Sequence, residues 1–337
     1  MTRNTGHRDR DLSIETLRGL GILLVVILHS VNADAGGAYH YFTFCFDYLT
    51  MPLFTAISGY VYAMRPVQPT NMKRFVSSKT RRIILPLLSV ATLQYFLSTF
   101  ISGQSASGWW RIYFVGYGQF WFLESLLLVF LVVAILDVLN TLDSFIVLSL
   151  LILLTGLARI VTPELKIDSI DGFIYILPYF LWGVSLKRFP WQLQNPILAL
   201  SMVFFAAGGT VLQHIAKGGG LEIRLDTNGP LATVTGIALV YIAFRWRRRI
   251  PLLDYIGKYS FSIFLFHAFG VSIGERMMGL VYDSDSYLPV FMLKLSGGVV
   301  AGILTEKVLS RFSFLQFIFL GIKPLPAQKT HADSSGS

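Results

Sequence analysis

Charged residues and cysteines are both scarce in this sequence of 337 residues. Only 14% of the residues are charged, whereas a soluble domain usually carries about a quarter. A single cysteine, Cys45, excludes an internal disulfide framework and any zinc site built on several thiolates. We therefore expect no metal site and no disulfide-stabilised soluble fold.

Two common catalytic signatures are also missing. The sequence has no glycine-rich phosphate loop that ends in Lys-Ser or Lys-Thr, which is the signature of the P-loop nucleotide-binding proteins. It also has no Gly-x-Ser-x-Gly nucleophile elbow of the kind that α/β-hydrolases use. Chemistry in this chain must therefore come from other residues.

Hydrophobic residues, by contrast, make up 54% of the chain. They gather in runs that reach the roughly 17 to 25 residues a helix needs to cross the hydrocarbon core of a bilayer. This pattern predicts an all-α polytopic membrane protein with ten transmembrane helices. The predicted spans are Leu12–Val31, Phe42–Met64, Ile83–Ile101, Phe120–Leu139, Phe145–Val161, Phe173–Leu186, Ile197–Gln213, Pro230–Phe244, Leu252–Ile273 and Leu288–Leu309.

The distribution of lysine and arginine indicates the orientation, because basic loops stay in the cytoplasm. With the N-terminus inside, the inner segments hold 19 of these residues and the outer segments six. We therefore predict that both termini are cytoplasmic, with residues 1–11 as an inner segment and 12–311 as the membrane domain. Residues 312–337 form a C-terminal tail, whose apolar-poor end we expect to be disordered. The net charge of +9 fits cytoplasmic loops and contact with membrane lipids, so we expect no nucleic-acid partner.

The first span carries Arg18 and His29 within its apolar run. Eleven residues are about three helical turns, so both side chains project from one face, roughly 16 Å apart. Ionisable groups inside a membrane are costly and usually face a functional path. Histidine can act as a base, an acid or an acyl acceptor, and arginine suits phosphates or carboxylates. The alternative is structural, with Arg18 reaching toward the interface and His29 as a hydrogen-bonded packing residue.

A basic stretch lies in the connection between the second and third spans. It contains five lysine and arginine residues from Lys73 to Arg82, including Lys79, Arg81 and Arg82, and Arg65 at the end of the second span is a sixth. Such a cluster can bind the phosphates of a nucleotide-bearing donor or the headgroups of anionic lipids. Both interpretations remain open from the residues alone.

Four further residues are candidates for a site. Ser58 lies where Pro52 and Gly59 interrupt the second span, which can open a cavity or permit close helix packing. Trp121 can anchor the fourth span at the interface. Glu124, several residues into that span, needs a partner, for which Arg18 and His29 are possible. His267 in the ninth span is a second candidate catalytic histidine or a buried structural one.

Together, and in this order, these pieces resemble the integral membrane acyltransferase family 3. The resemblance is carried by Arg18-x10-His29, Leu53-Phe54 with Ser58-Gly59-Tyr60, the basic run that ends in Arg81-Arg82 before Pro86, Trp121-Phe122-Leu123, and Gly257-Lys258-Tyr259-Ser260 leading to His267. Within the family, Met51-Pro52-Leu53-Phe54 looks most like the fucose 4-O-acetylase and polysaccharide O-acetyltransferase branch. The basic stretch departs from the Arg-x3-Arg pattern common in the family, and Lys79, Arg81 and Arg82 are the residues nearest to that pattern.

The resemblance implies an O-acetyltransferase of the bacterial cytoplasmic (inner) membrane. Acetyl-CoA or another acyl-CoA would be the donor, and a sugar hydroxyl of a surface polysaccharide or its lipid-linked precursor the acceptor. His29 and Arg18 match the essential pair of the family, and Glu124 is a further catalytic candidate. Ser58, Trp121 and His267 would serve as substrate-binding or structural residues. The main alternative is a transporter or flippase of a lipid-linked saccharide, which also needs intramembrane charges and broken helices.

Overall fold

The computed structural model describes residues 12–31, 46–103, 108–113, 116–162, 167–217, 229–281 and 287–323. The predicted N-terminal segment 1–11 and the tail end expected to be disordered, from residue 324, lie outside these residues. So do Cys45 and the first residues of the second predicted span. Every described element is helical, which agrees with the all-α prediction.

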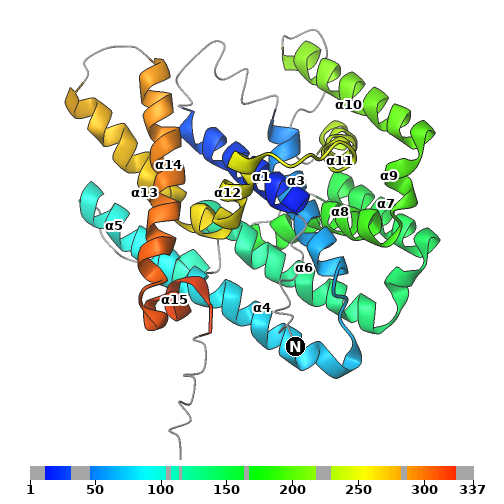
Figure 1. Ribbon diagram of the computed structural model, residues 1–337, viewed down its shortest axis with the longest axis horizontal. Coiled ribbons are helices and arrows are strands. Elements are labelled where there is room, and N and C mark those ends of the chain that lie inside the picture. The colour runs from blue at the N-terminus through cyan, green and yellow to red at the C-terminus, as the bar shows by residue number, and fades with distance from the viewer. Residues whose placement is uncertain are drawn as a thin grey trace, which may run out of the picture.

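The helices form one bundle in which distant parts of the chain lie side by side (Figure 1). Helices α13 and α14 pair at one end, α10 lies at the other, and α1 and α3 lie between them. The helices are α1 (Leu12–Ser30), α3 (Asp47–Ala63), α4 (Met72–Pro86), α5 (Thr92–Ser102), α6 (Trp121–Val138), α7 (Phe145–Val161), α8 (Asp168–Arg188), α9 (Trp191–Gln194), α10 (Pro196–Lys217), α11 (Pro230–Arg245), α12 (Pro251–Lys258), α13 (Ser260–Val281), α14 (Tyr287–Leu309) and α15 (Ser313–Leu320).

Among the described residues, six helical stretches are long and apolar enough to cross a membrane, and the bent pair α12–α13 would make a seventh. The other predicted spans correspond to α3, α7 and α11, which have 17, 17 and 16 residues. These lengths are at the short end of what a bilayer requires. The chain is thus a polytopic helical membrane protein, while the number of ten crossings and the cytoplasmic location of both termini stay predictions.

The basic stretch before the third span is itself helical. Residues 73–82 belong to α4, which continues through a π-helical turn, η2 (Leu87–Ala91), into α5. Pro86 lies directly before this turn, and a proline both lacks the backbone N–H and crowds the carbonyl four residues earlier, so the helix widens there. The basic residues are therefore held on a rigid helix rather than on a loop.

The ninth span, which we predicted as one helix, is broken. Helices α12 and α13 meet at an angle of 81° around Tyr259. A tertiary contact accompanies the break: a Cβ on Gly257 would lie 2.0 Å from the backbone oxygen of Glu15, and one on Gly19 would lie 2.0 Å from that of Leu253. The backbones of α1 and α12 touch at these glycines, so α12 is held across α1.

Helices α3 and α8 are also in backbone contact. A Cβ on Gly59 would lie 2.0 Å from the oxygen of Phe180, and one on Gly183 would lie 1.9 Å from the oxygen of Ala56. Small residues permit this close approach of membrane helices. It makes the centre of the bundle intolerant of any added side-chain atom at these positions.

We expect Gly183→Ala to destabilise the protein by about 1–3 kcal/mol or more, because overpacking forces the backbones apart. The matched control is Gly208→Ala on α10, where an added Cβ meets nothing within 4 Å and alanine favours the helix. Thermal unfolding in detergent measures both variants. Equal melting temperatures for the two would contradict the close contact between α3 and α8.

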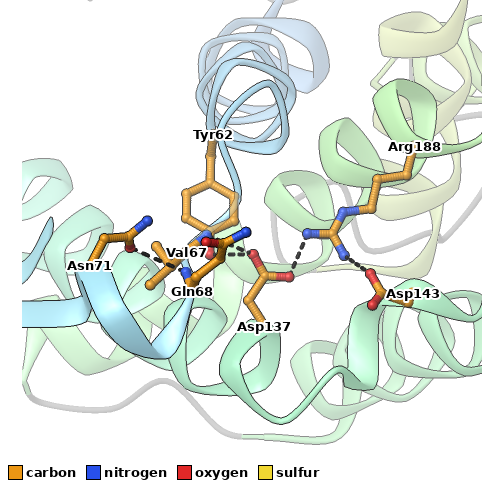
Figure 2. Close-up of polar contacts among 7 residues, drawn as sticks. All are labelled: Tyr62, Val67, Gln68, Asn71, Asp137, Asp143 and Arg188. Atoms are coloured by element: carbon orange, nitrogen blue, oxygen red, sulfur yellow. Dashed lines mark hydrogen bonds and ion pairs between the residues drawn. The ribbon is translucent and has the colours of Figure 1, made fainter.

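A polar network ties together the ends of α3, α6 and α8 (Figure 2). Asp137 accepts hydrogen bonds from the Tyr62 hydroxyl at 2.8 Å and the Val67 backbone N–H at 3.2 Å. Its other carboxylate oxygen pairs with Arg188, which also pairs with Asp143 at 3.0 Å. Because Val67 belongs to the connection that precedes α4, the network fixes the start of the basic helix.

Candidate active site

A cavity of about 480 Å³ opens between α1, α3, α4, α6, α12, α13 and the C-terminal residues. Four basic side chains line it: Arg18 of α1, Lys79 and Arg82 of α4, and Lys258 at the end of α12. Glu306 of α14 is the one carboxylate among the lining residues. We call this space the cationic cavity, and its charge suits a polyanionic ligand such as a phosphate-bearing group.

The structure brings the predicted residues Arg18, Lys79 and Arg82 together in this cavity, although they come from two different helices. The Lys79 ammonium lies 3.6 Å from the centroid of the Phe130 ring, a distance at which the ring attracts the cation. Lys258 joins them because the break after α12 turns its side chain into the cavity. In the sequence, Lys258 belongs to a motif of the family resemblance, but nothing there predicts it as a site residue.

Arg81 lies elsewhere. Its Nε donates a hydrogen bond to the backbone oxygen of Gly321 at 3.0 Å, and it is not among the residues that line the cavity. This contact holds the chain after α15 against α4, and Leu320 and Ile322 close part of the cavity as a result. Arg81 therefore supports the cavity from outside.

Arg18 is paired within its own helix. Its Nη1 lies 3.0 Å from Oε1 of Glu15, one turn earlier. The carboxylate that pairs with Arg18 is therefore Glu15 of the same helix and not Glu124. The guanidinium still lines the cavity, so the ion pair orients it without removing it from the site.

Serine hydroxyl groups from two helices, α3 and α13, also line the cavity. Ser58 lines it, and its hydroxyl donates to the backbone oxygen of Phe54 at 3.1 Å. Ser262 of α13 donates to Oε2 of Glu306 at 2.5 Å. Uncharged polar groups and a carboxylate from α3, α13 and α14 therefore line the cavity beside its basic side chains.

His29 and His267 form a pair beyond the cavity. Their ring centroids lie 4.9 Å apart, with an angle of 52° between the planes. His267 is fully buried, whereas His29 at the last turn of α1 is exposed. Neither ring is among the residues that line the cationic cavity.

The surroundings of His267 define its tautomer. Its Nδ1 lies 3.1 Å from the oxygen of Ile263 and 2.9 Å from that of Phe264, so this nitrogen carries the proton and donates it. Its Nε2 is buried and has no hydrogen-bond partner. In a neutral imidazole that nitrogen is an acceptor, and the ring of His29 is its neighbour.

Glu124 and Trp121 occupy a separate region at the start of α6. Ser169 and Asp168, at the start of α8, are the polar neighbours of Glu124, and its Oε1 is buried without a hydrogen-bond partner. Trp121 packs against Phe122 and Tyr175. Within the described part of the chain, no hydrogen bond or ion pair joins Glu124 to Arg18 or His29.

Across the described residues, no three His, Cys, Asp or Glu side chains are grouped so that they could hold a metal ion. The chemical groups at hand are therefore two imidazoles, a carboxylate and a basic cavity. This set can hold a phosphate-bearing donor and move a proton or an acyl group at histidine.

The comparisons with known proteins agree with this arrangement. A family model described as an acyltransferase domain matches residues 11–306. No curated protein and no solved structure matches the chain. The family match covers α1 to α14, including the cavity's four basic residues and both histidines. The chain therefore belongs to the acyltransferase 3 family and is a membrane acyltransferase.

Proposed function

We propose that the protein is an O-acetyltransferase of the bacterial cytoplasmic membrane. It takes the acyl group from cytoplasmic acetyl-CoA, or another acyl-CoA, and transfers it to a sugar hydroxyl. The acceptor is a surface polysaccharide or its lipid-linked precursor. The observation that carries the proposal is the cationic cavity beside the His29–His267 pair.

The cavity suits the donor in charge and in position. The several phosphates of an acyl-CoA match the basic side chains of Arg18, Lys79, Arg82 and Lys258, which line one space. Arg18 lies in the first half of α1 and His29 at its end. With the N-terminus inside, the phosphates bind toward the cytoplasm and the acyl end points toward the outer half of the bundle.

His29 has two chemical routes for the transfer. As a general base, its imidazole takes the proton of the sugar hydroxyl while the oxygen attacks the thioester carbonyl. The C–S bond breaks, and the thiolate takes the proton back to give free CoA. As a nucleophile, His29 attacks the carbonyl itself, the C–S bond breaks, and the leaving thiolate takes the N–H proton of the ring to give free CoA. The sugar hydroxyl then attacks the acyl-imidazole and leaves its proton on the ring.

His267 is a positioning residue in this mechanism. Its Nδ1 is held by two backbone carbonyls, so its Nε2 can accept a hydrogen bond from one ring nitrogen of His29. The other nitrogen of His29 then keeps a lone pair for the reaction. The buried ring of His267 would thus determine which tautomer the exposed ring of His29 adopts.

Replacing Lys79 by glutamine is expected to raise KM for the acyl-CoA about 10- to 100-fold with little change in kcat. A hydrogen bond to a charged group is worth about 1.5–3 kcal/mol, and contacts to the phosphates are distant from the reacting carbonyl. The matched control is Lys73→Gln, an exposed lysine earlier in α4 that does not line the cavity. Steady-state kinetics with varied acyl-CoA measures both, and equal KM values would remove Lys79 from the donor site.

The proposed function is tested with detergent-solubilised protein, an acyl-CoA labelled in its acyl group and a lipid-linked saccharide acceptor. Transfer of the label to the saccharide, with release of free CoA, is the expected result. In proteoliposomes, movement of intact saccharide without any acylated product would overturn the proposal in favour of a transporter. Mass spectrometry of surface glycans from cells with and without the protein would then identify the acylated sugar.

A further inference from the structure

Three phenylalanine rings from three helices meet in the cationic cavity. Phe54 of α3, Phe122 of α6 and Phe264 of α13 all line it. The ring centroids lie 5.9 Å apart for Phe54 and Phe122, 6.3 Å for Phe54 and Phe264, and 5.6 Å for Phe122 and Phe264. Each ring therefore contacts the other two at separations where aromatic rings attract. We call these three residues the phenylalanine barrier.

The barrier lines the cavity and adjoins the histidine pair through Phe264. The Phe264 ring centroid is 6.3 Å from that of His267, whose other aromatic neighbour is His29. Phe54 rests on α1, where a Cβ on Gly21 would lie 3.1 Å from its Cδ2 atom. Gly21 comes three residues after Arg18 and eight before His29. The rings thus cover the path along α1 from the basic residues to the histidine.

The three rings differ in how firmly they are held. Phe122 and Phe264 are 1% and 3% exposed, and interiors of this kind are close-packed. Phe54 is only partly buried, so it has the most freedom to turn. A group that passes from the cavity to His29 must move the Phe54 ring aside.

We propose that the phenylalanine barrier limits the length of the transferred acyl group, so that the donor is a short-chain acyl-CoA carrying an acetyl or propionyl group. The inference rests on the proposed function. To bring the thioester carbonyl to His29 while the phosphates stay on the basic residues, the acyl chain must pass the rings first. Each added methylene then has to fit between close-packed aromatic side chains, and one methylene can change kcat/KM about 10- to 200-fold.

The experiment measures kcat/KM with acetyl-, propionyl-, butyryl- and hexanoyl-CoA. For the wild-type protein we expect a fall of at least about tenfold from acetyl- to butyryl-CoA. Phe54→Ala removes the most mobile ring and should raise the butyryl-to-acetyl ratio at least about tenfold. Phe54→Leu keeps bulk at the position and should change the ratio less.

Gly21→Ala tests the barrier in the opposite direction. Its Cβ would press on the Phe54 ring, while alanine favours the helix and so preserves folding. We expect it to lower the propionyl-to-acetyl ratio. The control is Phe204→Ala on α10, where the ring is 72% exposed and the ratios should not change.

The outcomes separate this inference from the proposed function. If acetyl transfer depends on His29 but neither Phe54→Ala nor Gly21→Ala changes the ratios, the barrier does not set chain length and the proposed function stands. If the wild-type protein uses hexanoyl-CoA with the same kcat/KM as acetyl-CoA, the barrier likewise does not set chain length, and the proposed function again stands. If the folded wild-type protein transfers no acyl group from any acyl-CoA, both proposals fail.

Discussion

Replacing His29 with alanine should lower the rate of acyl transfer by about 10²- to 10⁴-fold, the usual contribution of a general acid–base group. The loss should appear in kcat and not in KM for the acyl-CoA, because the basic residues of the cavity remain in place. The structure supports His29 over His267 for this role because His29 is the exposed member of the pair. Transfer assays with the purified, folded variant measure the effect.

The matched control for this prediction is His214→Ala. His214 also lies on a helix, α10, which packs against α9 and α11 and not against the cavity. This variant should keep nearly the normal rate. A near-normal rate for His29→Ala would refute the proposed mechanism. Mass spectrometry of the acid-quenched wild-type reaction distinguishes the two routes, because only the nucleophilic route leaves an acyl group on His29.

Apart from the ninth span, which the structure breaks into two helices, the hydrophobic runs predicted the long apolar helices at about the right place. This works because a segment in lipid must satisfy its own backbone hydrogen bonds, which leaves the helix as the available structure. The break after Lys258 carries no such signal. It has no proline at the bend, and it coincides with a tertiary contact between Gly257 and the backbone of Glu15. The position of Lys258 in the cavity could therefore not be predicted.

Some positions of site residues could likewise be predicted from the sequence and others could not. Arg81 and Arg82 are neighbours in the sequence, but successive helix residues point about 100° apart. The structure places Arg82 in the cavity and Arg81 on the oxygen of Gly321, and only the packing of α15 decides between them. Phe54 belongs to a motif that carries the family resemblance, but the chain has 27 phenylalanines and the sequence does not show which three of their rings contact one another.

The residue type of Glu124 does not determine which side chain is its partner. A carboxylate in a span requires a partner, and Arg18 and His29 were reasonable candidates. In the structure Arg18 is paired with Glu15, and the polar neighbours of Glu124 lie at the start of α8. Its catalytic role stays a prediction, because no hydrogen bond joins Glu124 to His29 within the described part of the chain.

The largest effect on stability is expected at Asp137. Asp137→Ala should lower the free energy of unfolding by about 3–5 kcal/mol, because removing one member of a buried ion pair leaves the other charge uncompensated. Arg188 is 12% exposed and would keep only Asp143 as a partner. Tyr62 and the Val67 N–H would lose their acceptor as well. Unfolding of the variant in detergent, induced by heat or by denaturant, measures the loss in stability.

Asp143 supplies the control from within the same network. It contacts the same arginine, but its side chain is 70% exposed, and exposed ion pairs contribute about 0–1 kcal/mol. Asp143→Ala should therefore leave stability nearly unchanged. Because Asp137 holds the connection before α4, a mild substitution such as Asp137→Asn should also raise KM for the acyl-CoA, by shifting the helix that carries Lys79 and Arg82. Equal stability losses at the two aspartates would show that burial does not govern this network.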